Sequence, residues 1–170
     1  MSSNDRYFEG ILEEAGRIAA GKGDAAERLQ NLCVLLEGSV PHYDWVGFYI
    51  ADPKDKVLQL GPYVGAPTEH VRIPFGKGIC GQAADRKRTF IVQDVTKEDN
   101  YLSCSSSVRS EIVLPIMDGG TVIGELDIDS HSISPFTDQD RTMLERICAL
   151  CMPLAREYRS SLPGSGFKLK

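Results

Sequence analysis

The sequence has little positive charge, no long apolar run and no even set of cysteines. Among its 170 residues, 24 Asp and Glu outnumber 19 Lys and Arg, and the net charge is −5. A surface that binds nucleic acid must be basic, so nucleic acid is not an expected partner. No apolar stretch approaches the roughly 20 residues that cross a bilayer, and the polar start is not a signal peptide. We therefore expect a cytoplasmic protein without a membrane partner.

The five cysteines are odd in number and widely spaced, which makes a poor disulfide framework, so we expect reduced thiols with individual roles. Cys33, Cys148 and Cys151 lie on apolar faces of predicted helices, where a free cysteine behaves as a small buried hydrophobe. Cys148 and Cys151 form a CxxC motif. A metal site built on such a motif usually needs a second pair of ligands, and none is evident in the sequence. Cys80 and Cys104 lie on no such stripe, and Cys104 lies among serines. A redox or nucleophilic role is open for both.

Apolar periodicity predicts one α+β domain over residues 1–160, with an antiparallel sheet that has helices on one face and the long loops on the other. A mobile tail is expected over 161–170. Asp24 and Thr137 are predicted helix caps, and Pro153 should kink the last helix. Helices are expected over 6–20 and 25–36, in a short segment that follows the turn at 74–81 and ends near residue 86, and over 138–158. Strands are expected over 43–50, 57–60, 70–73, 89–92, 110–117 and 121–130. The spacing of Gly76–Gly81 matches neither nucleotide fingerprint, which favours a tight turn over a phosphate loop.

The last two strands form a predicted hairpin, because Asp118-Gly119-Gly120 separates two alternating runs. A three-residue loop would pair Met117 with Thr121 and Glu111 with Asp127. One face is then apolar, formed by Ile112, Leu114, Ile116, Val122, Leu126 and Ile128.

The other face of this hairpin gathers Glu111, Glu125, Asp127 and Asp129. Like charges opposed across a sheet are destabilising. A cationic ligand, a shared proton or bulk water would each make the cluster tolerable, and the sequence leaves these three explanations open.

Trp45 and Tyr49 share one face of the strand over 43–50. Aromatic residues in a strand are usually core residues. A second interpretation is an aromatic pocket wall that attracts a sulfonium-like or ammonium centre. The residues alone do not decide between the two.

Five short blocks of the sequence resemble the free methionine-(R)-sulfoxide reductases, which are stand-alone GAF domains. The blocks are DWVGFY at 44–49, LGP at 60–62, GICG at 78–81, SEIVLP at 110–115 and GELDIDS at 124–130. The resemblance covers about residues 30–155 and implies a central antiparallel sheet flanked by helices. It matches the family's catalytic cysteine to Cys104. The family's substrate-pocket residues match Trp45, Tyr49, Glu111, Asp127 and Asp129.

The resemblance implies reduction of free methionine sulfoxide by a thiol, with no metal and no organic cofactor. The Cys104 thiolate would attack the sulfoxide sulfur while Glu111 or Asp127, kept protonated by its neighbours, delivers a proton to oxygen. Methionine would leave and Cys104 would become a sulfenic acid.

Two positions depart from the family pattern. The family's usual resolving cysteine is His70 here, and a histidine common three residues before the catalytic cysteine is Tyr101. Resolution would then fall to Cys80 or an external thiol, with a thioredoxin-like dithiol restoring the enzyme. The alternative function is a GAF module that binds a small molecule without turnover. A homodimer through the terminal helices is a third option.

Overall fold

Six antiparallel strands form one sheet at the centre of the computed structural model, which describes residues 1–103 and 105–163. They are β1 (Trp45–Asp52), β2 (Val57–Val64), β3 (Arg72–Pro74), β4 (Phe90–Val92), β5 (Ser110–Asp118) and β6 (Thr121–Ser130). Their order in the sheet is β3-β2-β1-β6-β5-β4. Cys104 and most of the tail predicted to be mobile, residues 164–170, lie outside the described residues.

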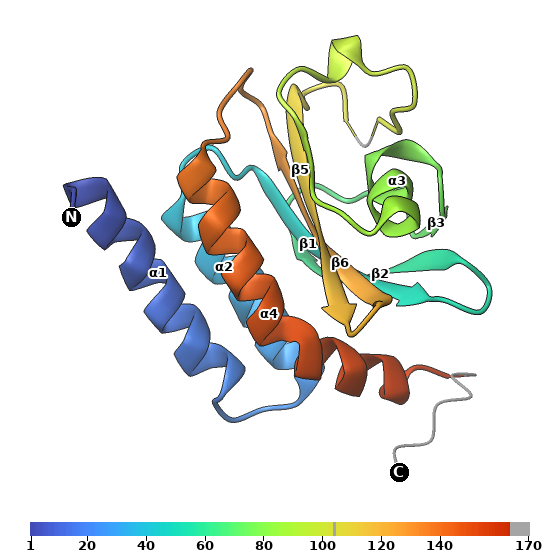
Figure 1. Cartoon of the computed structure of the whole chain (residues 1–170), viewed down its shortest axis with the longest axis horizontal. Coiled ribbons are helices and arrows are strands. Elements are labelled where there is room, and N and C mark those ends of the chain that lie inside the picture. The colour runs from blue at the N-terminus through green and yellow to red at the C-terminus, as the bar shows by residue number, and fades with distance from the viewer. Residues whose placement is uncertain (104, 164–170) are drawn as a thin grey trace.

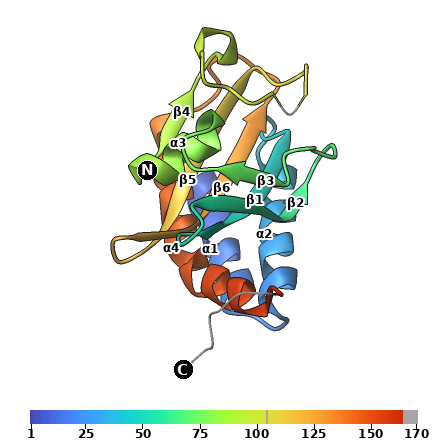
Figure 2. The same ribbon diagram turned by 90° about the vertical axis from the view of Figure 1, so that its right-hand side faces the viewer.

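Helices lie on both faces of this sheet. Three of them, α1 (Ser3–Ala19), α2 (Ala25–Ser39) and α4 (Asp138–Ser161), cover one face, and α3 (Gly78–Arg86) lies on the other with the long loops (Figure 1). Figure 2 shows α3 in front of β5 and β6, on the face opposite α1, α2 and α4. The predicted α+β class with an antiparallel sheet is confirmed. In the described residues no helix is long and apolar enough to cross a membrane.

The larger core lies between the three helices and the sheet. Cys33, Cys148 and Cys151 are buried in it, as predicted for small apolar side chains. The sequence also predicts Leu150 on the apolar stripe of the last helix. That prediction is wrong, because Leu150 is 37% exposed and lies beside the buried stripe of α4.

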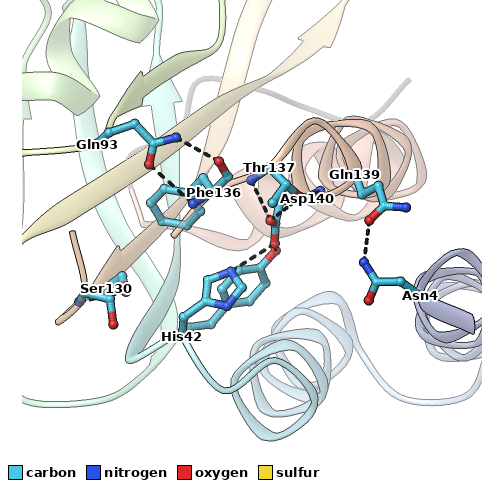
Figure 3. Close-up of polar contacts among 10 residues, drawn as sticks. Asn4, His42, Gln93, Ser130, Phe136, Thr137, Gln139 and Asp140 are labelled. Atoms are coloured by element: carbon cyan, nitrogen blue, oxygen red, sulfur yellow. Dashed lines mark hydrogen bonds and ion pairs between the residues drawn. The ribbon is translucent and has the colours of Figure 1, made fainter. Parts of the chain in front are cut away.

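Both predicted helix caps are present: Asp24 accepts a hydrogen bond from Glu27 N, and Thr137 forms a capping box with Asp140. The Asp140 carboxylate also reaches the segment before β1 (Figure 3). Its Oδ1 accepts from Tyr43 Oη at 2.5 Å and contacts His42 Nε2 at 3.1 Å. This buried carboxylate therefore joins the start of α4 to the sheet. Figure 1 shows α4 bending toward its C-terminal end, in agreement with the predicted kink at Pro153.

The hairpin register differs from the prediction by one residue at the turn and by two residues at Glu111. Glu111 pairs with Asp129, and Asp118 pairs with Thr121, so the loop is Gly119-Gly120 alone. The predicted pairs are wrong, yet the acidic face is correct, because a shift of two residues preserves side-chain faces.

A β-bulge in β6 accounts for one misplaced apolar residue. Ile116 pairs with Gly124 while Met117 pairs with Val122, which leaves Ile123 as the extra residue. Ile123 packs in the core beneath the helices, and Val122 packs on the α3 face. The prediction that Val122 shares the face of Leu126 is therefore wrong.

Candidate functional site

Four acidic side chains are buried side by side on the face of the sheet that α3 covers. Glu125, Asp127 and Asp129 alternate along β6, and Glu111 lies opposite Asp129 on β5. None of the four is more than 5% exposed. Bulk water therefore does not make this cluster tolerable, and that explanation is excluded.

Cys80 faces this cluster from α3. The thiol donates to Glu111 Oε1 at 3.7 Å, and the side chain is only 5% exposed. Cys80 thus belongs to the buried face of a helix, unlike its interpretation from the sequence. Burial, and next the negative charges of Asp127, Glu125 and Glu111, raise its pKa well above the usual value. The residue is therefore held as a thiol and not as a thiolate.

The carboxyl groups favour a shared proton within the cluster. Burial raises the pKa of Asp127, while hydrogen bonds with Glu111 and Cys80 lower it. A hydrogen bond between two carboxyl groups requires that one of them carry a proton. Burial, followed by the charge of Asp127, also raises the pKa of Glu125 and of Asp129 well above the usual range. The raised pKa values therefore favour the protonated form of these carboxyl groups at neutral pH.

A small cavity of about 10 Å³ adjoins the acidic cluster. Its walls include Tyr49, His70, Cys80, Glu111 and Asp127. This volume is roughly that of one water molecule, so an amino acid can bind only if wall side chains move apart. Of the two predicted aromatic residues, Tyr49 is a wall of the cavity.

Two backbone carbonyls hold the cavity wall in place. The Tyr49 hydroxyl donates to His70 O at 2.8 Å, and His70 Nε2 lies 2.9 Å from Ser103 O. His70 therefore connects the loop before β3 to the residue that precedes Cys104 in the chain.

Trp45 has a packing role in this structure. It stacks on Tyr63 with ring centroids 5.4 Å apart, and its Nε1 donates to Ala66 O at 3.0 Å. The ring lies over Gly47 and Gly65, and a Cβ at Gly47 would lie 2.3 Å from it. Trp45 and Asp129 are not among the described residues that line the cavity. Their role in substrate binding stays a prediction.

The sequence did not indicate two further walls of the cavity, Lys77 and Leu102. Lys77 precedes the helix that carries Cys80, and that adjacency was a usable signal. No pattern in the sequence pointed to Leu102. Two larger hollows, of about 220 Å³ between α1 and α4 and about 730 Å³ beside the turn after β1, have no described cysteine in their walls. The chemistry therefore centres on the smaller cavity.

Residues 24–152 match the GAF domain family. The chain belongs to that family. The predicted resemblance and the GAF fold are thereby confirmed, and relatives carry the predicted family name. The free methionine-R-sulfoxide reductase of Escherichia coli is 34% identical over 143 residues, which cover 84% of this chain and 85% of that protein. GAF domain-containing protein A of Dictyostelium discoideum is 34% identical, over 87% of this chain and 92% of that protein.

A solved structure agrees over nearly the whole chain. The free methionine-R-sulfoxide reductase of Neisseria meningitidis, in complex with its substrate, superposes with a TM-score of 0.85. It is 31% identical and covers 95% of this chain and 96% of its own.

Proposed function

We propose that this protein reduces free L-methionine-(R)-sulfoxide to methionine, with Cys104 as the nucleophile. The observation that supports it best is the buried Glu111–Asp127 pair at the wall of a cavity, where burial raises the pKa of Asp127 and a hydrogen bond joins it to Glu111. Such a pair offers a proton donor at neutral pH, where an ordinary carboxyl group is ionised. The similar proteins named for this reaction, one of them solved with its substrate, support the choice of substrate.

In the proposed reaction, the Cys104 thiolate attacks the sulfoxide sulfur and the acid pair protonates the oxygen. The oxygen leaves with the cysteine as a sulfenic acid, and methionine is released. Asp127 and Asp129 accept hydrogen bonds from the ammonium group of the free amino acid, and Tyr49 and Trp45 lie beside its side chain. This step oxidises one thiol to a sulfenic acid for each sulfoxide, a second thiol is needed to resolve it, and no metal or organic cofactor is used.

We further propose that Cys80 resolves the sulfenic acid, because no cysteine stands at position 70. The Cys80 thiol would form a disulfide with Cys104 and release water, and a thioredoxin-like dithiol in the cytoplasm would reduce that disulfide. Attack requires the thiolate, whose formation burial and the neighbouring carboxylates oppose. Resolution by Cys80 is therefore expected to speed up as pH rises.

The test is to incubate the reduced protein with free methionine-R-sulfoxide and dithiothreitol and to measure methionine. Wild type should turn over, and Cys104→Ser should not, since a hydroxyl is a far weaker nucleophile than a thiolate. Cys33→Ser is the matched control, because Cys33 is buried in the other core. Sulfoxide binding without methionine in wild type would contradict the proposal and identify a non-catalytic GAF binding module.

A further inference from the structure

Three side chains of metal-binding types converge on the cavity wall from three elements: Cys80 of α3, Glu111 of β5 and Asp127 of β6. The Cys80 sulfur and one oxygen from each carboxylate all lie within 4.8 Å of one another. The separation between Cys80 Sγ and Glu111 Oε1 is 3.7 Å. Around a tetrahedral zinc ion, a sulfur ligand at about 2.3 Å and an oxygen ligand at about 2.0 Å lie roughly 3.5 Å apart. The Cys80–Glu111 spacing is thus close to that of two ligands of one zinc ion, and Asp127 lies within 4.8 Å of both.

A separate observation points to a missing ligand at this place. Asp127 is 1% exposed and lines the cavity, yet its Oδ1 has no hydrogen-bond partner in the described part of the chain. A buried acceptor without a partner is costly, and a cation would compensate it. The cavity has room for about one water molecule, enough for a fourth, non-protein ligand.

We propose that Cys80, Glu111 and Asp127 bind a thiophilic divalent cation, with Zn²⁺ as the best match, and that this ion excludes the sulfoxide substrate. A thiolate with two carboxylates favours Zn²⁺ or Co²⁺ over Mg²⁺ and Ca²⁺, which prefer oxygen ligands alone. Binding itself does not depend on the proposed function. The exclusion of substrate does, since it requires Glu111 and Asp127 to bind the sulfoxide.

The test is a titration of the reduced, chelator-treated protein with Co²⁺, followed by absorbance. One equivalent should produce a thiolate-to-cobalt charge-transfer band in the near ultraviolet, and Zn²⁺ should remove it by displacement. Cys80→Ser should lose the band, while Cys33→Ser and Cys104→Ser should retain it. Asp127→Asn should weaken Co²⁺ binding roughly tenfold or more, as expected for a disturbed ligand set. This variant replaces Cys80→Ser as the test if Cys80→Ser does not fold.

A band that survives in Cys80→Ser, or Co²⁺ binding unchanged in Asp127→Asn, would overturn the proposal. So would the absence of stoichiometric Co²⁺ binding to wild type. In turnover assays Zn²⁺ should raise the apparent KM without lowering kcat. Stoichiometric metal binding without competition would leave the metal site standing and contradict the assignment of Glu111 and Asp127 to the substrate.

Discussion

Glu125 is the carboxyl group whose replacement most directly tests the electrostatics of the acidic row. It is fully buried, and neither oxygen has a hydrogen-bond partner in the described part of the chain. Burial raises its pKa well above the ordinary value of 4.5, and the charge of Asp127 raises it further, against a smaller lowering by the Cys80 thiol. The group therefore takes up a proton when the chain folds at neutral pH.

The size of this effect follows from linkage. When the pKa of a group is higher in the folded state than in the unfolded state, its full contribution to stability is present below the unfolded-state pKa. That contribution is lost as pH rises toward the folded-state pKa. From the ordinary value of 4.5, a proton kept at pH 7 costs on the order of 3 kcal/mol of unfolding free energy at most. At pH 5 the same cost is under about 1 kcal/mol.

Glu125→Gln should therefore raise the free energy of unfolding, and the gain should grow with pH. The amide has nearly the same volume as the carboxyl group and carries no charge. Urea denaturation of both proteins at pH 5 and pH 7 measures the gain. Glu37→Gln, at an exposed position on α2, is the matched control and should show no gain at either pH. A variant less stable than wild type at pH 7, or a gain independent of pH, would refute the reasoning.

Three further predictions concern the acid pair, the resolving thiol and the cap of α4. Asp127→Asn should lower kcat/KM for the free sulfoxide, by an amount that corresponds to about 1.5–3 kcal/mol of activation free energy, the usual contribution of a charged hydrogen bond. The thermal midpoint should not fall. Unchanged kinetics would show that Asp127 is not part of the site. One equivalent of substrate should give a Cys80–Cys104 disulfide by peptide mass, and Cys80→Ser should instead accumulate a sulfenic acid that dimedone traps. Thioredoxin-driven cycling that is unchanged in Cys80→Ser would exclude Cys80 as resolver. Asp140→Asn should destabilise the fold by roughly 1–3 kcal/mol at pH 7. Burial alone would raise the pKa of Asp140, but hydrogen bonds from His42, Tyr43 and Thr137 lower it below 3.8, so its contribution is present above that pH and lost as pH falls. The difference in thermal midpoint should shrink toward pH 3, and a constant difference would contradict this.

Local rules predicted the helix caps and most strands, and they failed where strand pairing decided the outcome. The sequence predicted the strand now called β2 only to Leu60, because Gly61 and Pro62 signal a turn. The strand continues to Val64, since the register shift opposite Gly47–Tyr49 places Pro62 where the ladder is interrupted. The hairpin register could not be predicted either, because the bulge at Ile123 depends on how two strands pair across the sheet.

By itself, the sequence determined that Glu111, Glu125, Asp127 and Asp129 share one face of the sheet. Alternation along a strand has a period of two, so even a register error of two residues left that face correct. Only the tertiary structure decided that α3 covers this face, that Cys80 points at the acids, and that water is excluded from them. Those facts depend on packing between distant segments. Burial then raises the pKa values of the carboxyl groups, which favours their protonated, uncharged forms over a row of like charges.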